Sequence, residues 1–262
     1  MHIGSSNDAE TVKAQYATAD KLSARISFHE RYSINPQGFG SWLISNYEIE
    51  NGASVLDIGC GNGSLWAKNG NSTASFGKLV LADTSEGMLE TARENLGERD
   101  NLEYICADIQ ALPFEDDTFD AVIANYVLYH VPELARGIAE VHRVLKPDGV
   151  LYCATYGEHN FTDTLADWLA LGGEEYRPNH NFTMENGAAK LKRSFAHVEA
   201  RFYEDSLRVT DVGGLVEYLR SLVSLRVTDD IPDGRLFELL NSHAVNGVIE
   251  LPKEYGMFIA RG

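Results

Sequence analysis

The sequence predicts an α/β fold with a mostly parallel sheet. Two observations predict it. From residue 53 onward, short apolar runs alternate with helical segments, which is typical of βαβ units. The first of these runs, 54–58, passes directly into Gly59, Gly61 and Gly63, and glycines there allow a sharp turn and close approach to a ligand.

Apolar runs define the expected strands. Runs buried on both faces of a parallel sheet are nearly continuous rather than alternating. The chain offers them at 54–58, 78–82, 102–107, 119–124, 150–155, 198–203 and 255–260.

Start and stop signals define the helices of this region. Ser85 begins a helix whose apolar face contains Met88, and Gly97 ends it. Pro132 opens the next helix, over 134–145, and a Lys-Pro-Asp-Gly turn at 146–149 leads into the following strand.

Two segments of the chain depart from this alternation. Residues 1–50 read as a polar tail followed by helices over 14–32 and 39–47, and residues 157–182 read as an insertion with one short helix around 164–171. Helical pattern resumes at Thr183, with further helices over 212–225 and 234–246. The expected organisation is a helical cap at 1–50 and a main domain at 51–262, with 157–182 on its substrate side.

Composition excludes several functions. The formal net charge of −17 would repel nucleic-acid phosphates. No apolar run is long enough for a membrane-spanning helix, and residues 1–10 lack the layout of a signal peptide. Three cysteines without a CxxC pair support neither a disulfide framework nor a zinc site. We expect a cytoplasmic protein with no membrane or nucleic-acid partner and no metal, present as a monomer or homodimer.

Polar residues follow the ends of the first four expected strands: the glycine loop 59–63, Asp83, Asp108 and Asn125. The carboxyl ends of parallel strands meet at one edge of the sheet, where ligands of open α/β sheets bind. A carboxylate at position 83 can accept hydrogen bonds from both hydroxyls of a ribose. The sequence therefore predicts a nucleoside site at this edge.

Four blocks resemble the class I S-adenosylmethionine (SAM)-dependent methyltransferases of the small-molecule type, close to the ubiquinone/menaquinone-biosynthesis methyltransferases. They span about positions 53–156 in order, at 55–63, 82–89, 107–114 and 140–151. The resemblance implies a three-layer, Rossmann-like, seven-stranded sheet with an antiparallel last strand, an N-terminal helical cap and an insertion after the fifth strand. It also implies SAM as cofactor, with S-adenosylhomocysteine as product.

The resemblance also implies roles for individual residues. Asp57, Gly59, Cys60 and Gly61 would surround the methionine part of SAM, and the Asn125 carbonyl would contact its ammonium group. Asp83 would bind the ribose. Around the adenine, the resemblance places Thr84, Met88, Asp108 and the backbone N–H of Ile109.

The methyl acceptor is expected to be a small molecule that presents N, O, S or C as nucleophile. His130 and His29 are the catalytic candidates, and Tyr16, Tyr126 and Tyr156 are candidates for the substrate pocket. Tyr129, His159 and His180 are further candidate bases, needed only if the nucleophile must lose a proton.

Two other functions remain open. An NAD(P)-dependent oxidoreductase would need glycine at position 64 and a hydride-transfer motif such as Tyr-x-x-x-Lys, and the chain has neither. A non-catalytic SAM-binding protein would keep the same acidic and glycine positions.

Overall fold

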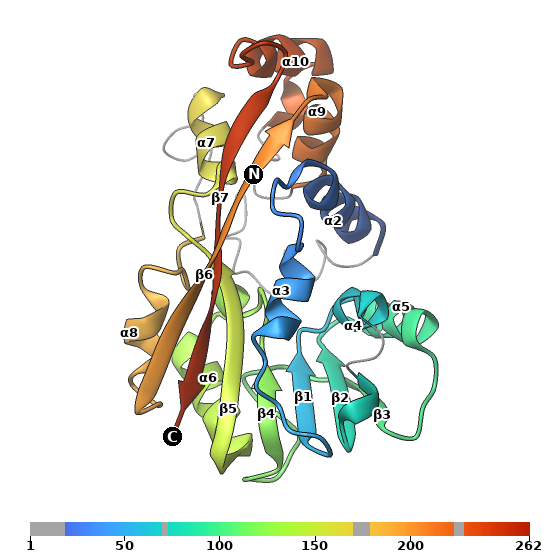
Figure 1. Cartoon of the computed structure of the whole chain (residues 1–262), viewed down its shortest axis with the longest axis vertical. Coiled ribbons are helices and arrows are strands. Elements are labelled where there is room, and N and C mark those ends of the chain that lie inside the picture. The colour runs from blue at the N-terminus through green and yellow to red at the C-terminus, as the bar shows by residue number, and fades with distance from the viewer. Residues whose placement is uncertain (1–18, 70–72, 170–178, 223–227) are drawn as a thin grey trace.

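The described residues form a seven-stranded sheet with the strand order β3-β2-β1-β4-β5-β7-β6 (Figure 1). The computed structural model describes residues 19–69, 73–169, 179–222 and 228–262. The strands are β1 (Ser54–Ile58), β2 (Lys78–Asp83), β3 (Leu102–Cys106), β4 (Phe119–Ile123), β5 (Leu145–Tyr156), β6 (His197–Val209) and β7 (Ile249–Arg261). All neighbours from β3 to β5 pair in parallel, and β7 runs antiparallel to both β5 and β6. The predicted sheet with an antiparallel last strand is confirmed.

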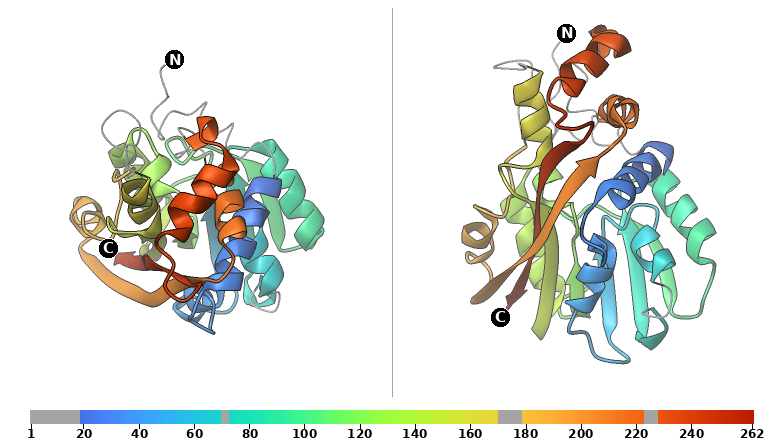
Figure 2. Two further views of the ribbon diagram at one scale, coloured as in Figure 1. Left: turned by 90° about the horizontal axis from the view of Figure 1, so that it is seen from above. Right: turned by 45° about the horizontal axis from the view of Figure 1, so that its top comes forward.

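Helices cover both faces of this sheet, which makes the domain three-layered (Figure 2). On one face, α6 (Leu134–Val144) and α8 (Gly187–Leu191) pack on the side chains of Leu56 and Ile58 and their neighbours. On the other, α3 (Phe39–Ser45), α4 (Ser64–Lys68) and α5 (Glu86–Leu96) pack on Val55 and its neighbours. The remaining four α-helices of the described residues contribute to a second core away from these two faces: α2 (Ala19–Tyr32), α7 (Phe161–Trp168), α9 (Val212–Ser221) and α10 (Asp233–Asn241).

The predicted start and stop of α5 are confirmed. The Ser85 hydroxyl accepts a hydrogen bond from the Met88 N–H at 3.3 Å, as an N-cap does, and Gly97 ends the helix with φ of 74°. Because α5 starts directly after β2, its first turn lies at the ligand-binding edge of the sheet.

The predicted turn at 146–149 is instead part of β5. Phe119 pairs with Leu145 and Ala121 with Val150, so residues 146–149 of β5 lie opposite the single residue Asp120 of β4. The Lys-Pro-Asp-Gly sequence therefore makes an irregularity within a strand, and β5 begins directly where α6 ends.

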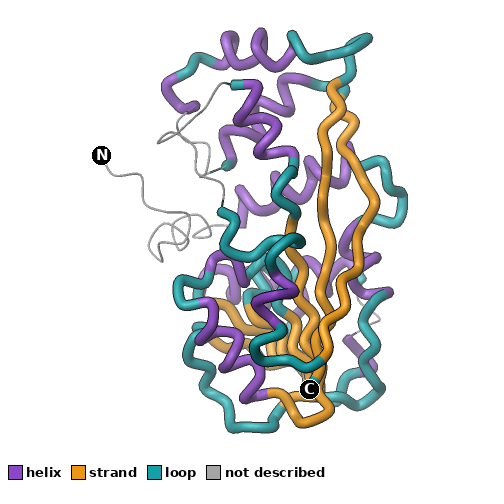
Figure 3. Tube along the Cα trace, turned by 90° about the vertical axis from the view of Figure 1, so that its left-hand side faces the viewer, coloured by secondary structure: helices purple, strands orange, loops and turns teal. Residues whose placement is uncertain are grey.

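Strands β6 and β7 extend far beyond the sheet (Figures 1 and 3). They pair over their whole length, from His197 with Arg261 to Val209 with Ile249, whereas β5 pairs only with 255–261 of β7. The sequence predicts only 198–203 and 255–260, because polar residues interrupt β6 throughout its length and leave it without a continuous apolar run. The free ends of the two strands pack with α2, α7, α9 and α10 around a second apolar core, and this assembly is called the cap below.

A buried ion pair between β6 and β7 also holds the segment that follows α2. Lys253 of β7 and Asp205 of β6 lie 2.6 Å apart, with side chains that are 2% and 0% exposed. The other Asp205 oxygen accepts from the backbone N–H groups of Ile34 and Asn35, both at 3.0 Å, and Ser33 donates its hydroxyl to the same carboxylate. The segment after α2 is thereby fixed to the β6–β7 pair.

Candidate functional site

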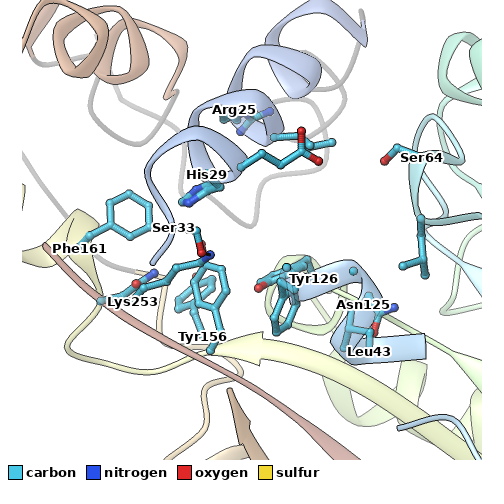
Figure 4. Close-up of a pocket in the computed structure, with 18 of the residues that line it drawn as sticks. Arg25, His29, Ser33, Leu43, Ser64, Asn125, Tyr126, Tyr156, Phe161 and Lys253 are labelled. Carbon is cyan, nitrogen blue, oxygen red and sulfur yellow. Dashed lines mark hydrogen bonds between the residues drawn. The ribbon is translucent and has the colours of Figure 1, made fainter. Parts of the chain in front are cut away.

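A cavity of about 770 Å³ lies between the carboxyl ends of the strands and the cap (Figure 4). This volume is in the range of small-molecule sites in proteins. One end, called the sheet end, is lined by residues of the β1 and β4 loops, and the other, the cap end, by residues of α2, α7, α9 and β7. The sheet end includes Asp57, Gly59, Cys60 and Asn125, and the cap end includes His29, Asn160, Phe161 and Tyr218.

The glycine loop turns sharply at Gly59, whose φ is 75°. Its N–H donates to the Ala82 carbonyl at 2.7 Å, which fixes the loop to the end of β2. A Cβ atom at position 59 would lie 2.1 Å from Cγ2 of Val127. Only glycine satisfies both the backbone conformation and the contact.

Replacing Gly59 by alanine should therefore destabilise the protein by about 3 kcal/mol or more, from backbone strain together with the Val127 overlap. Urea unfolding measures this loss. Gly52→Ala is the matched control. Gly52 has φ of 83°, but a Cβ atom at position 52 would have no neighbour within 4 Å, so only the strain of about 1 kcal/mol applies. Equal losses in the two variants would contradict the role of the Val127 contact.

Asp57 places a buried acid beside this loop. The residue is 3% exposed, and its carboxylate accepts a hydrogen bond from the Trp66 indole N–H at 2.7 Å. Burial, against the effect of the Trp66 hydrogen bond and with a contribution from nearby Asp83, raises the pKa of Asp57 to about 7. A cation bound here would restore the charge of the carboxylate.

Asp83 is held at the end of β2 by the loops on either side. Its two oxygens accept from the backbone N–H groups of Gly61 at 3.0 Å and Ser85 at 2.9 Å. Burial nevertheless raises its pKa above the ordinary value. The two carboxylates and the glycine loop thus form one acidic group at the sheet edge, as the sequence predicts.

The residues predicted for adenine lie outside the cavity wall. The Asp108 carboxylate accepts from the backbone and side chain of Gln110, at 2.8 and 3.1 Å. Thr84 is exposed, whereas the side chains of Met88 and Ile109 are buried. The structure brings these four residues to the ends of β2 and β3, next to Asp83, and their roles stay predictions.

Asn125 and Tyr126 follow β4 at the floor of the cavity. The Asn125 side chain donates to the Tyr47 hydroxyl at 2.7 Å and accepts from the Ala154 N–H at 3.2 Å, so it is held in place by protein groups. Tyr126 has φ of 58°, a strained conformation for a bulky residue and one that recurs at functional sites. In Figure 4, Tyr126 stands between Asn125 on one side and Tyr156 and Lys253 on the other.

Aromatic side chains dominate the cap end. The Tyr126 ring lies 5.5 Å from Tyr255 and 5.7 Å from Phe39, and Phe161 lies 5.7 Å from Tyr218. The Tyr126 hydroxyl is buried and has no hydrogen-bond partner among the described residues. This end can therefore surround a planar or apolar molecule.

His29 lies within this aromatic group. Its Nε2 atom is 3.0 Å from the Tyr218 hydroxyl, and its ring is 5.2 Å from Phe161. Burial, together with Lys253 and Arg25 and against the effect of Asp205, lowers the pKa of His29 to about 3. The imidazole is uncharged at neutral pH.

Of the other residues predicted as catalytic or substrate-pocket candidates, some line the cavity and others do not. His130 and Tyr156 line the cavity, with the His130 ring 4.3 Å from Tyr129 and the Tyr156 hydroxyl donating to the Asn179 carbonyl at 2.8 Å. His180 also lines it, whereas His159 is exposed and is not on the wall. Tyr16 lies outside the described residues.

Several wall residues could not be predicted from their sequence context, chiefly Asn160, Tyr218, Lys253 and Tyr255. Three of them belong to α9 and β7, far from the predicted substrate segments at 1–50 and 157–182. Nothing in the sequence marks these residues: Lys253, for example, lies between Pro252 and Glu254, before the expected strand 255–260.

Neither a metal site nor a membrane segment emerges from the described ranges. No group of three His, Cys, Asp or Glu side chains there is placed to hold a metal ion. Within the same ranges, every helix is too short or too polar to span a bilayer.

The sheet end of the cavity belongs to a segment that is similar to known proteins. Residues 56–153 match the family described as "Methyltransferase domain". Over 106 residues the chain is 42% identical to the ubiquinone/menaquinone biosynthesis C-methyltransferase UbiE of Escherichia fergusonii and 41% identical to UbiE of Escherichia coli K12. Each match covers 39% of this chain and 42% of the relative, so the similarity spans less than half of either protein.

Solved structures share the fold over most of the chain. The YcgJ protein of Bacillus subtilis matches with a TM-score of 0.60 at 19% identity, covering 85% of this chain and 98% of its own. The [4+2]-cyclase SpnF matches with a TM-score of 0.60 at 16% identity, covering 98% and 97%. At these identities the likeness concerns the fold alone.

Proposed function

We infer that this chain, which carries a class I SAM-dependent methyltransferase domain, transfers the methyl group of SAM to a small molecule bound at the cap end. The observation that carries this inference is the placement of Asp57 and Gly59 at one end of a cavity whose other end is aromatic, with Asp83 bonded to the same glycine loop just outside the cavity wall. An acidic end and an apolar end provide separate places for a cationic methyl donor and an uncharged acceptor.

The residues present fit SAM. Asp57 is a buried acid whose pKa is raised by burial, and an ammonium group beside it would offset that cost. Gly59 lines the cavity with backbone atoms alone, so a ligand can approach this loop closely. Asp83 presents a carboxylate fixed by Gly61 and Ser85, suited to two ribose hydroxyls.

When bound, SAM supplies an electrophilic methyl group for in-line displacement. The protein holds the acceptor between Tyr126 and the cap residues and excludes water from the reaction path. Such alignment can contribute up to about 7–11 kcal/mol to the lowering of a barrier. His130 and His29 are the candidates for contact with the acceptor, and no general base is needed for a nucleophile that carries no proton to lose.

Carbon is the first acceptor atom to test. The two UbiE relatives, which match 106 residues of this chain, are named C-methyltransferases. Cap residues that would select the acceptor, such as His29 and Tyr218, lie outside residues 56–153, which match the methyltransferase family, so nitrogen, oxygen and sulfur acceptors belong in the same panel.

Titration calorimetry with SAM, S-adenosylhomocysteine and NAD tests the cofactor. We expect binding of the first two and none of NAD; the reverse would overturn the proposal. Release of S-adenosylhomocysteine in the presence of small carbon, amine, phenol and thiol acceptors tests turnover. Binding without turnover across the panel would indicate a SAM-binding protein without transferase activity.

Asp83→Asn should weaken SAM binding about 10- to 100-fold, because hydrogen bonds to a charged carboxylate contribute roughly 1.5–3 kcal/mol. Calorimetry measures the change. Asp116→Asn is the control, since Asp116 is 73% exposed and pairs with Arg143 away from the cavity. Unchanged SAM affinity in the Asp83 variant would remove this residue from the site.

A further inference from the structure

The cap end contains buried polar atoms that the protein itself leaves unused. Nδ1 of His29, Oδ1 of Asn160 and the hydroxyl of Tyr126 are buried without a hydrogen-bond partner among the described residues. All three residues line the cavity. Buried polar groups in native proteins are nearly always paired, so such atoms on a cavity wall point to a ligand that pairs with them.

The position of Asn160 at the start of α7 supports the same conclusion. It occupies the N-cap position of α7, where an asparagine side chain ordinarily accepts from a backbone N–H of the first turn. Here its side chain makes no such bond, although its backbone carbonyl still accepts from Asp163 and Thr164. A hydrogen bond with the Tyr255 side chain holds the amide in place. The amide oxygen is therefore available to a molecule in the cavity, and it can only accept a hydrogen bond.

The charges around this end largely cancel. Lys253 and Asp205 pair with each other at 2.6 Å, and Glu30 pairs with Lys68 at 2.5 Å on the cavity wall. Arg25 of α2 and Asp163 of α7 also line the cavity, and their charges are opposite. Burial together with Lys253 and Arg25 keeps the His29 imidazole neutral. The Asn160 amide and the Tyr126 hydroxyl are uncharged groups as well, so none of the three unused atoms carries a charge.

A neutral imidazole of such low basicity is a poor proton acceptor near neutral pH. Efficient general bases have a pKa close to the working pH, and burial lowers the pKa of His29 to about 3. Its Nε2 atom is already engaged with Tyr218 at 3.0 Å. What remains for Nδ1 is a hydrogen bond to the bound molecule.

We propose that His29 and Asn160 together bind an O–H or N–H group of an uncharged methyl acceptor, and that His29 serves as a hydrogen-bond partner rather than as the general base. This proposal rests on the methyl-transfer function inferred above and narrows its substrate class. The acceptor is a neutral molecule with an apolar or aromatic body and at least one hydrogen-bond donor. Carboxylates and ammonium compounds are disfavoured.

A set of probes with one body and different head groups tests the class. Binding of 4-phenylphenol, biphenyl, biphenyl-4-carboxylate and 4-phenylbenzylammonium is measured by calorimetry on protein saturated with S-adenosylhomocysteine. We expect 4-phenylphenol to bind about tenfold more tightly than each of the others, since a polar site rejects ligands that leave its groups unpaired. Equal or tighter binding of the carboxylate or the ammonium compound overturns the proposal, as does absence of 4-phenylphenol binding up to about 1 mM.

Two variants assign the effect to the named residues. His29→Phe keeps an aromatic ring and Asn160→Leu keeps a similar volume, and each should remove most of the preference for 4-phenylphenol over biphenyl. Binding of S-adenosylhomocysteine should stay unchanged in both, which shows that they fold. Retention of the full preference in both variants contradicts the proposal.

Nitrogen NMR of the imidazole separates the two roles of His29. As a neutral hydrogen-bond partner, His29 shows no titration between about pH 5 and 8, and its Nδ1 resonance shifts when 4-phenylphenol binds. Titration of His29 within that interval would restore the role of a general base. Failure of S-adenosylhomocysteine to bind would instead refute the methyl-transfer function and leave the head-group preference to be measured without it.

Discussion

Replacing Lys253 by methionine should lower the free energy of unfolding by about 3–5 kcal/mol, the cost of leaving one member of a buried ion pair without its partner. Asp205 would remain as a buried carboxylate with a 0% exposed side chain. Burial alone would raise the pKa of Asp205, but the hydrogen bonds from Lys253 and Ser33 outweigh burial and hold it below the ordinary value. Urea unfolding followed by circular dichroism measures the loss.

Lys78→Met is the matched control for this prediction. Lys78 pairs with Glu103 at a similar distance, 2.5 Å, but the two side chains are 52% and 44% exposed. Exposed pairs contribute about 0–1 kcal/mol, so the control should change stability little. Equal losses in the two variants would show that burial does not strengthen the Lys253–Asp205 pair.

Asp57→Asn should have opposite effects on stability and on binding. Asparagine keeps an acceptor for the Trp66 indole and removes the buried charge, so the ligand-free variant should be more stable than the wild type above pH 7, by roughly 1–4 kcal/mol. The same change removes the partner of a ligand ammonium group, and SAM affinity should fall about tenfold or more. Thermal unfolding and calorimetry measure the two effects on one sample.

The pH dependence follows from the raised pKa of Asp57. Between the ordinary value of 3.8 and about 7, the folded protein holds a proton on Asp57 that the unfolded chain has released. Unfolding free energy in the wild type therefore falls as pH rises through this interval, and the Asn variant lacks the fall. SAM affinity in the wild type should weaken as pH drops below 7. Asp120→Asn is the control of opposite sign, because Lys146 and the Ser54 N–H, against the effect of burial, lower the pKa of Asp120.

The parallel half of the sheet can be predicted from the sequence because its strands are buried on both faces. The apolar run predicts β1 with its observed bounds, 54–58, and local chemistry predicts the cap of α5 at Ser85. Edge strand β6 has apolar residues that polar ones interrupt, so the sequence pattern predicts only part of its length. Its outer half is defined by pairing with β7 and by the second core, neither of which is local.

The site divides in the same way. Asp57, Gly59 and Asp83 occur in short motifs whose spacing reports their chemistry, so the sequence places them together. The cap end brings together His29 and Tyr218, which lie 189 positions apart on different helices, and Asn160 from the start of a third helix. Each is ordinary in its own segment, and only the fold shows that they share a wall.

The length of the β6–β7 pair determines how far the cap end of the cavity lies from the sheet end, and this length changes in steps of one residue. A strand rises about 3.4 Å per residue and presents alternate side chains to opposite faces. Adding two residues to each strand would therefore move the cap about 7 Å farther from the sheet and keep every side chain on its face of the strand. Adding one residue to each would turn Lys253 and Asp205 to the opposite face. Descendants of this protein could thus accommodate longer acceptors by paired insertions in these two strands, with the methyl-donor end left untouched.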